Sequence, residues 1–375
     1  MKKVVIAIDS FKGCLPSVEA GKAAAEGIRS VYPECEVICL PIADGGEGML
    51  DVLIMATNGQ EVPISAHDPL MRWRNTYYGI SENEETAFIE MASISGLPLV
   101  PPERRNPMLT TTYGTGEIIR DALERGCRNF IIGIGGSATN DAGLGMLQAL
   151  GFRFSDKEGK EVGTGRGEVL IKVAHIDSTC VHPALNSCRF TVACDVQNPF
   201  YGPEGAAYVF APQKGADREM VEALDAGLQN FPEVIRHTTG KDISHHPGAG
   251  AAGGMGGSLL AFLNAELKPG IQLMLEALNF SNKIKSADLI ITGEGKADRQ
   301  TLMGKVPSGI LAEARKQNIP VILLAGNIED SDELQQAGFE GVFSVNPPFI
   351  SLEEAMRPEV ARKNIQQTVE SICKK

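Results

Sequence analysis

The fold can be inferred from one segment near the N-terminus, Val4-Val5-Ile6-Ala7-Ile8-Asp9-Ser10-Phe11-Lys12-Gly13. Its first half is a continuous apolar run of the kind that is buried on both faces of a parallel sheet. Its second half is polar and contains a glycine, as expected where a strand passes into a loop. A helical sequence follows at 17–29, with Ser17 as a candidate N-cap. The segment therefore predicts the first βα unit of a parallel sheet.

The same pattern of apolar run and helix returns at both ends of the chain. Further strands are predicted at 36–40, 288–292, 320–324 and 341–345. Helices are predicted at 49–57, 308–317, 331–336 and 359–373. Strands that alternate with helices in this way are typical of a doubly wound, flavodoxin-like sheet.

The middle of the chain has a different character. Residues 61–91 contain short alternating stretches such as TYYGI and TAFIE, which indicate hairpins. Beyond them we expect helices at 116–125 and 143–150, and strands at 129–134, 189–194 and 206–210. We therefore predict an α/β protein with two domains. Residues 1–60 and 283–375 would form a flavodoxin-like, doubly wound parallel sheet domain, and residues 61–282 a mixed α/β domain inserted into it.

The composition is that of an acidic globular protein. Of the 375 residues, 43% are hydrophobic and 22% are charged, which is enough apolar material for a core. The 47 Asp and Glu residues against 35 Lys and Arg give a formal net charge of −12, which would repel a nucleic-acid backbone. The eight cysteines form no C-x-x-C pair and indicate reduced thiols. Because no signal sequence or run of about 18 apolar residues is present, we expect a cytoplasmic protein with no nucleic-acid or membrane partner.

Carboxylates, glycines and lysines follow three of the strands predicted for the doubly wound sheet. These residues are Asp9, Ser10 and Lys12 after the first strand, Asp44, Gly45 and Gly46 after the second, and Glu294 and Asp298 after the third. Ligands of open α/β sheets bind at the carboxyl ends of the strands, so these side chains are predicted to gather at one edge. Helix capping is the alternative role for Asp9 and Asp44. Together the residues predict a polar site that can bind a metal ion.

A glycine-rich loop, GIGGSATND at 133–141, lies between a predicted strand and a predicted helix. Backbone N–H groups in such a loop approach an oxyanion closely, and the helix that follows would add the positive end of its dipole. We expect a phosphate site formed by Gly135, Gly136, Ser137, Thr139 and Asn140. The loop also fits G-x-G-x-x-A, so a dinucleotide site is the alternative. A Walker A motif is absent from the sequence.

Two more charged residues follow strands predicted in the middle of the chain. Asp195 follows the run at 189–194, and Lys214 follows the run at 206–210. An acid and a lysine at the ends of neighbouring strands suit a base or metal ligand and a cation that neutralises phosphate. A surface turn with a solvated lysine is the alternative for Lys214.

Several segments form a recognisable series. They are IDSFKG at 8–13, ADGGEG at 43–48, TTYGTGE at 111–117, GIGGSATNDAG at 133–143, CDVQNPFYGPEGAA at 194–207, FAPQKGA at 210–216, GAGAAGG at 248–254 and ITGEGKAD at 291–298. In order and spacing this series resembles the signature blocks of the type I glycerate kinase family of bacteria, over essentially the whole chain. Small departures are Cys14, where Ser is expected, and Asp141-Ala142-Gly143, where Asp-Gly-Gly is more usual.

The resemblance implies a kinase that phosphorylates D-glycerate with ATP and Mg²⁺, generally to 2-phosphoglycerate. It also implies a flavodoxin-like domain with an inserted α/β domain, in agreement with the segmentation above. Phosphoryl transfer depends on positioning and on cations that balance the charge of the transferred group. We therefore assign metal-ligand or base duty to Asp195 and Asp44, and assign to Lys12 the neutralisation of a substrate oxygen.

The remaining candidates would surround the substrates. Substrate-binding residues would be Asp9, Ser10, Gly45, Gly46, Lys214, Glu294 and Asp298, and the loop Gly135–Asn140 would bind the phosphate of ATP. Lys12, Arg72, Arg105 and Lys214 are the candidate cations for the carboxylate of glycerate. We expect the transfer to take place in a cleft between the two domains, since closure of a cleft excludes water.

Two other classes of protein remain open at this stage. An NAD(P)-dependent oxidoreductase that acts on a small hydroxy acid would use GIGGSA as its dinucleotide loop. A non-catalytic sugar-acid-binding protein would keep the glycine loops and need few carboxylates. The density of Asp, Glu and Lys at the loop tips argues against the binding protein. A homodimer is compatible with the sequence, which does not fix the oligomeric state.

Overall fold

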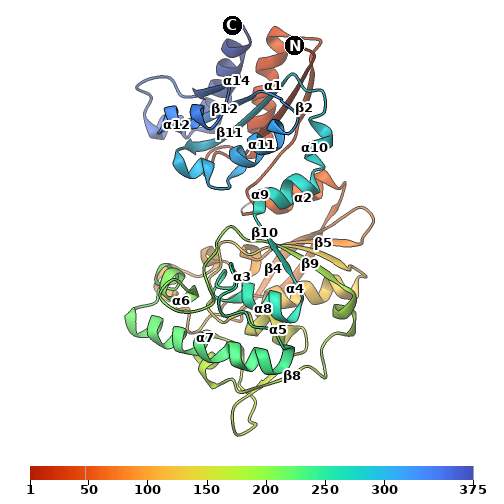
Figure 1. Ribbon diagram of the computed structural model, residues 1–375, viewed down its shortest axis with the longest axis vertical. Helices are drawn as coiled ribbons and strands as arrows, with labels where there is room; N and C mark the ends of the chain where they lie inside the picture. Colours follow the sequence, from red (N-terminus) through yellow and green to blue (C-terminus); the bar gives the residue numbers. More distant parts are fainter. Residues whose placement is uncertain (47, 375) are drawn as a thin grey trace. The chain divides into compact units, whose positions relative to one another are not determined.

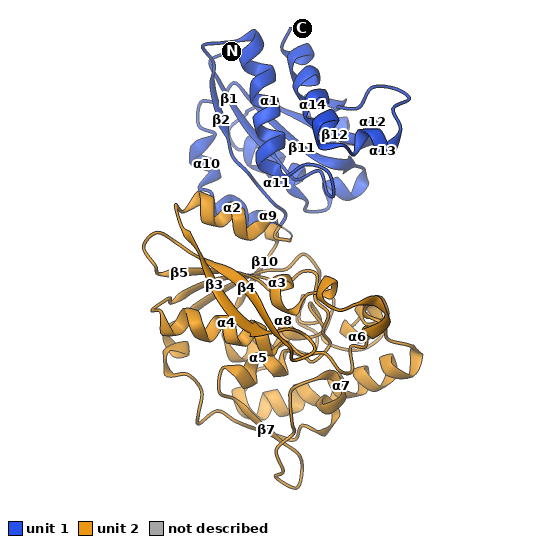
Figure 2. Cartoon of the chain, turned by 180° about the vertical axis from the view of Figure 1, so that it is seen from behind, with its two compact units in different colours: residues 1–44, 271–375 blue, residues 45–270 orange. Residues whose placement is uncertain are grey.

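The computed structural model describes residues 1–46 and 48–374 and divides the chain into two compact units. Unit 1 contains residues 1–44 and 271–375, and unit 2 contains residues 45–270 (Figure 2). The sequence predicts the two crossings at 60/61 and 282/283 instead. The first crossing comes earlier because helix α2 (Met49–Ala56) packs on strands β4 and β5 of unit 2. The second comes earlier because Ile271 lies against Gly309 of unit 1.

Unit 1 is built on a five-stranded sheet in which every pair of neighbouring strands is parallel. Its strands, in spatial order, are β13 (Gly341–Ser344), β12 (Val321–Ile328), β11 (Leu289–Ala297), β1 (Lys3–Ile8) and β2 (Glu36–Cys39). Read from β2, the strands follow one another as second, first, third, fourth and fifth along unit 1, which is the flavodoxin-like order. The predicted flavodoxin-like fold class is confirmed.

Helices cover both faces of this sheet. They are α1 (Ser17–Val31), α9 (Gly270–Ala277), α10 (Phe280–Lys283), α11 (Val306–Arg315), α12 (Ser331–Gln336), α13 (Leu352–Ala355) and α14 (Pro358–Cys373). Helices α1 and α14 lie side by side (Figure 1). They cover the face of β1 that carries Val4, Ile6 and Ile8. Helix α11 packs against β1, β11 and β12 on the opposite face. The two buried faces account for the continuous apolar runs of the strands.

Strands β11 and β12 continue beyond the ends predicted at Thr292 and Leu324. Parallel pairing of Glu294 with Ala325 and of Lys296 with Asn327 extends the sheet past its apolar core. The polar residues expected in a loop after the third strand therefore lie in the strand itself. Their side chains are held in a fixed register at the carboxyl edge.

Unit 2 contains a mixed six-stranded sheet. Its strands, in spatial order, are β10 (Glu266–Lys268), β9 (Arg189–Ala193), β6 (Asn129–Gly133), β5 (Thr86–Glu90), β4 (Trp73–Ile80) and β3 (Gln60–His67). Pairing is parallel from β10 to β5, and β3, β4 and β5 are antiparallel neighbours. A separate antiparallel pair consists of β7 (Arg153–Ser155) and β8 (His175–Asp177). The predicted mixed α/β architecture and the predicted hairpin are confirmed.

The core of unit 2 lies between this sheet and several helices. Besides α2, the helices are α3 (Ala92–Ser95), α4 (Tyr113–Glu124), α5 (Leu144–Ala149), α6 (Ala206–Phe210), α7 (Arg218–Thr239) and α8 (Met255–Phe262). Helices α4, α5 and α8 supply side chains such as Ile119, Leu147 and Leu259 to the core, and α7 contributes Phe231. In the described part of the chain, no helix is long and apolar enough to cross a membrane.

The prediction of a strand at 206–210 is wrong, because this run forms α6. Ala206 and Ala207 are buried, whereas Tyr208 and Val209 are exposed. Two buried residues followed by two exposed ones fit the helical period of 3.6 and not strand alternation. Lys214 consequently lies in a short 3₁₀ helix, Pro212–Lys214, and not at the end of a strand.

Candidate active site

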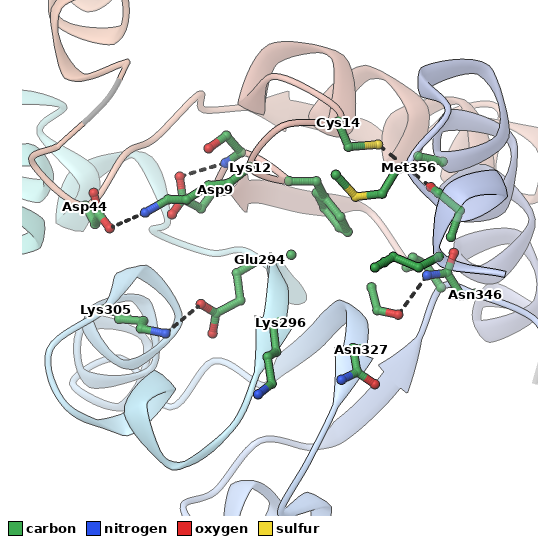
Figure 3. Close-up of a pocket in the computed structure, with 18 residues that line it drawn as sticks. Asp9, Lys12, Cys14, Asp44, Glu294, Lys296, Lys305, Asn327, Asn346 and Met356 are labelled. Carbon is green, nitrogen blue, oxygen red and sulfur yellow. Dashed lines mark hydrogen bonds and ion pairs between the residues drawn. The ribbon is translucent and has the colours of Figure 1, made fainter. Parts of the chain in front are cut away.

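Unit 1 has a pocket of about 320 Å³ at the carboxyl edge of its parallel sheet (Figure 3). Its charged lining residues are Asp9, Lys12, Asp44, Glu294, Lys296 and Lys305. They follow β1 and β2, lie on β11, or stand directly before α11. The structure thus brings together Asp9, Ser10, Lys12, Asp44 and Glu294, which the sequence predicts at one edge of the sheet.

Asp9 is the buried carboxylate of this pocket. Burial, with the negative charge of Asp44 as the next cause, raises its pKa from 3.8 to about 7. A hydrogen bond from the backbone N–H of Ser10 to Oδ1, 2.7 Å long, and the ammonium of Lys12 act in the opposite direction. A carboxylate with a pKa near neutrality can both accept and return a proton at physiological pH.

Lys12 and Asp44 form an ion pair at the open side of the pocket. Lys12 Nζ lies 3.4 Å from Asp44 Oδ2, and the lysine side chain is 65% exposed. The Asp44 side chain is 24% exposed. The ammonium is thus accessible to an incoming anion, and the half-buried carboxylate lies at the mouth of the pocket.

Glu294 is held in place from two sides. The hydroxyl of Thr301 donates to Oε1 at 2.6 Å, and Lys305 Nζ lies 3.6 Å from Oε2. Burial raises the pKa of Glu294, whereas these two partners lower it. The result is a fixed, partly neutralised carboxylate opposite Asp9.

Asp298 does not line the pocket, and its hydrogen bonds cap a short helix instead. Its side chain accepts from Gln300 N at 2.9 Å, and its own N–H donates to the hydroxyl of Thr301, which forms a capping box for the 3₁₀ helix Arg299–Leu302. Asp298 also lies 3.4 Å from Lys296 Nζ. Through Thr301 the capping box supports Glu294.

Unit 2 presents a second row of candidates at the carboxyl ends of its parallel strands. Glu90, Gly133, Ala193 and Lys268 are successive register partners on β5, β6, β9 and β10. A cavity of about 380 Å³ lies at this edge, lined by Gly45, Gly46, Glu90, Ala92, Ser93, Pro98, Gly133, Gly135 and Gly136. The glycines of two predicted site loops are therefore neighbours in one cavity.

The glycine-rich loop divides into an open part and a buried part. Gly135 and Gly136 are exposed to the cavity, whereas Ser137, Thr139 and Asn140 are buried. The helix dipole that was expected to support anion binding at this loop is not found. Helix α5 begins only at Leu144, after Gly143, and is less than two turns long. Backbone N–H groups, and not a helix end, are what this loop offers to an anion.

Gly135 provides a clean test of this loop. An added Cβ at Gly135 would meet no atom within 4 Å, so Gly135→Ala should fold normally and place a methyl group in the cavity. We expect an unchanged melting temperature and about a tenfold higher KM for the substrate whose anion binds there. The exposed Gly163, whose Cβ would also meet nothing, gives the matched control Gly163→Ala. Unchanged KM values for both substrates in Gly135→Ala would contradict anion binding at this loop.

Lys214 is buried behind the same loop and is only 2% exposed. Its Nζ donates to Ser137 Oγ at 2.8 Å and to the carbonyl oxygen of Thr139 at 2.6 Å. Burial lowers its pKa from 10.5 to about 7, and the charge of Asp141 acts against this shift. The ammonium thus contacts the loop from inside the protein.

Asp141 fixes the far end of the loop. Its carboxylate accepts from Thr112 N and Oγ1, both at 2.8 Å, and from the N–H groups of Gly143 and Gly145 at 3.2 Å. Burial raises its pKa, and these hydrogen bonds act in the opposite direction. Gly253 packs directly on this segment, since a Cβ there would lie 2.2 Å from the Thr139 carbonyl oxygen.

The free energy of unfolding should depend on pH because Lys214 is buried. Between pH 7 and 10.5 the unfolded chain keeps the Lys214 proton that the folded protein has lost, so the wild type gains stability as pH rises through this window. Lys214→Met removes this gain and leaves Ser137 and Thr139 without their donor, which costs about 1–3 kcal/mol per buried group. Thermal unfolding at pH 6.5 and pH 9 should show a larger deficit of the variant at pH 9. An equal deficit at both pH values would contradict a lowered pKa.

Asp195 is exposed and follows β9, as predicted. Its Oδ1 accepts a hydrogen bond of 2.8 Å from the N–H of Gly270, the last residue of unit 2. Gly45, the first residue of unit 2, lies against Ala193 and Gly270, because a Cβ there would approach the Gly270 Cα to 2.5 Å. Asp195 therefore lies beside both chain crossings.

Several polar residues near these pockets were not identified from the sequence. They are Lys296, Lys305, Asn327 and Asn346 in unit 1, and Glu90 and Ser93 in unit 2. Lys296 lies inside the quoted motif ITGEGKAD, which could have signalled it. The others come from segments without a motif and reach the pockets only through strand pairing or loop packing. Glu47, part of ADGGEG, lies outside the described residues.

The donor set suits Mg²⁺. Asp9, Asp44 and Glu294 offer carboxylate oxygens in one pocket, and hard cations prefer oxygen ligands. Mg²⁺ usually binds through one or two carboxylates together with substrate phosphates. No group of three or more His, Cys, Asp or Glu side chains within residues 1–46 and 48–374 is arranged to hold a metal ion by itself.

Two α/β units with carboxylates, lysines and open backbone N–H groups at their carboxyl edges define an enzyme that acts on anionic substrates. The model of the glycerate kinase family matches residues 4–375. The chain belongs to the glycerate kinase family. It is therefore a phosphotransferase with an alcohol group as acceptor, and the family activity is ATP-dependent phosphorylation of glycerate.

Individual relatives agree with this assignment. The chain is 47% identical over 356 residues to the glycerate 2-kinase of Escherichia coli K12, and the matched residues cover 95% of this chain and 93% of the relative. It is 45% identical over 372 residues to the glycerate kinase of Bacillus subtilis 168, and the matched residues cover 99% of this chain and 97% of that relative. A crystal structure of a protein described as glycerate kinase 2, from Salmonella typhimurium LT2, superimposes with a TM-score of 0.90 at 44% identity and covers 100% of this chain and 97% of that chain.

Proposed function

We propose that the enzyme transfers the γ-phosphoryl group of ATP to the 2-hydroxyl of D-glycerate, giving 2-phosphoglycerate, with Mg²⁺ bound. The single observation that carries the proposal is the unit 1 pocket, in which a buried carboxylate of pKa about 7, Asp9, is surrounded by lysines and further carboxylates. Such a set can take a hydroxyl proton and balance phosphate charge in one place. The name of the Escherichia coli relative, glycerate 2-kinase, supports the 2-hydroxyl as acceptor.

The charged residues have three proposed roles: proton transfer, neutralisation of phosphate charge and metal binding. Asp9 accepts the proton of the attacking hydroxyl, and Ser10 N–H orients its carboxylate. Lys12 and Lys305 neutralise oxygens of the transferred group. Asp44 and Asp195 would hold Mg²⁺, which when bound neutralises charge on the phosphate oxygens.

The loop of unit 2 binds an anion through the N–H groups of Gly135 and Gly136. This anion is a phosphate of ATP or the carboxylate of glycerate, and the KM values of Gly135→Ala distinguish the two. Lys214 and Asp141 position the loop from behind. The proposal requires both units for one reaction, in a cleft between them that excludes water.

Coupled measurement of ADP release over a panel of small hydroxy acids tests this function. We expect release with D-glycerate and Mg²⁺, and phosphorus NMR of the product should place the phosphate on carbon 2. Product phosphorylated on carbon 3 would overturn the regiochemistry only. Absence of ADP release with D-glycerate would overturn the function. The oxidoreductase and binding-protein alternatives are set aside by family membership.

A further inference from the structure

The unit 1 pocket has two chemically different ends (Figure 3). The charged end contains Lys12, which points toward Asp44, and Lys305, which points toward Glu294. The other end is lined mainly by apolar side chains, among them Met356, together with the carboxamides of Asn327 and Asn346. Its apolar lining consists of Phe11, Cys14, Val345, Leu352, Ala355, Met356 and Ala361.

The apolar end is not explained by glycerate. Glycerate is small and polar throughout, so at the charged end it would leave the apolar walls in contact with water. Binding pockets of roughly 300 Å³ and more accommodate larger ligands that have an apolar part and a few polar groups. An exposed apolar wall in a pocket indicates a ligand that brings apolar surface of its own, and the nearby lysines can pair with an anionic group of the same ligand.

Two carboxamides lie at the pocket and suit a heterocyclic edge. Asn346 Nδ2 donates to the Gly326 carbonyl oxygen at 2.8 Å, and its Oδ1 accepts from Asn364 Nδ2 at 3.2 Å, so the amide plane is fixed. The side chain of Asn327 is exposed and makes no hydrogen bond to other residues that the structure describes. A carboxamide can donate to and accept from adjacent ring atoms at once, as Asn and Gln do with adenine.

We propose that this apolar end is the site of the adenine ring of ATP. The inference rests on the proposed function and adds the location of the base. Adenine lies between the walls formed by Phe11 and Met356, its polar edge meets the Asn327 carboxamide, and the phosphate chain extends toward Lys12 and Lys305. The direction from base to phosphates follows the gradient from apolar to charged lining.

Charge placed at the apolar wall tests the proposal. Met356 is 39% exposed and Leu352 is 79% exposed, so Met356→Glu and Leu352→Glu should both fold. Calorimetric titration with ADP should show binding weakened at least about tenfold in Met356→Glu, as expected from losing one apolar side-chain contact. Binding of tripolyphosphate, which has no base, should be unchanged. The KM for ATP should rise by the same factor.

The matched control is Met55→Glu, at an exposed methionine on α2 in unit 2. It should leave ADP affinity at the wild-type value. ADP affinity and KM for ATP unchanged in both pocket variants would overturn the proposal. Equal weakening of ADP and tripolyphosphate would overturn it too, because the base would then contribute nothing. If wild-type protein releases no ADP with D-glycerate, the proposed function fails, whereas an active wild type with unaffected variants disproves only the base site.

Cysteine labelling gives a second readout that needs no substitution. Cys14 lines the apolar end, and Cys180 is exposed in unit 2. We expect ADP to slow alkylation of Cys14 by N-ethylmaleimide, as followed by peptide mass spectrometry, and to leave Cys180 unaffected. Tripolyphosphate and D-glycerate should not protect Cys14. Protection by D-glycerate and not by ADP would assign the pocket to the acid and overturn the proposal.

Discussion

Asp195→Asn should lower kcat by at least about 100-fold while the protein remains folded, because loss of a metal-binding or proton-accepting carboxylate removes contributions of this size. The asparagine Oδ1 can still accept the N–H of Gly270, so the local backbone should be preserved. Steady-state kinetics with D-glycerate and ATP, together with thermal unfolding, measure the two effects separately.

Asp177→Asn provides the matched control. Asp177 ends β8 in the same unit, and its Oδ1 likewise accepts one backbone N–H, that of Thr179, at 2.8 Å. This variant should keep wild-type kcat. A kcat within threefold of the wild type in Asp195→Asn would remove Asp195 from the mechanism. Equal losses in both variants would show that the effect is not specific to the site.

Asp9→Asn should produce opposite changes in activity and stability. Activity should fall at least about 100-fold, since the amide cannot take a proton from the acceptor hydroxyl. Stability should increase, because the folded protein has to hold a buried carboxylate whose pKa is raised from 3.8 to about 7. Between these two pH values the folded protein keeps a proton that the unfolded chain has lost, so wild-type stability falls as pH rises.

The stabilisation by Asp9→Asn should therefore be larger at pH 8 than at pH 5. Thermal unfolding of both proteins in metal-free buffer at these pH values measures it. Asp288→Asn is the contrasting control in unit 1. Its pKa is lowered, chiefly by the N–H of Lys3, so this variant should lose stability and retain activity. A stabilisation by Asp9→Asn that does not depend on pH would contradict the raised pKa of Asp9.

Much of unit 1 could be predicted from the sequence because its strands are buried on both faces. Continuous apolar runs at β1, β11 and β12 are typical of buried parallel strands, and the helical sequences between them made their type recognisable. Their ends were harder to place. Glu294 and Lys296 are polar, and only pairing with β12 keeps them in the strand. The run that became α6 was too short for periodicity to separate strand from helix.

The candidate site shows the same division. Asp9, Lys12, Asp44 and Glu294 were predicted to share one edge because the carboxyl ends of parallel strands must meet there. Their protonation was not predictable, since burial and the charge of Asp44 set the pKa of Asp9 only in the folded protein. The burial of Lys214 was not predictable either, because a lysine in a polar loop is ordinarily expected to be exposed to solvent.

Local residue patterns were enough to predict the order of the strands, the family, and the glycines and charges at the loop tips. The burial of Lys214 under the loop of Gly135 becomes visible only in the folded protein. The same holds for the pocket that residues from β11, β12, α13 and the segment after β13 enclose. Desolvation and contacts between distant segments exist only after the chain has folded, and no spacing along the sequence encodes them.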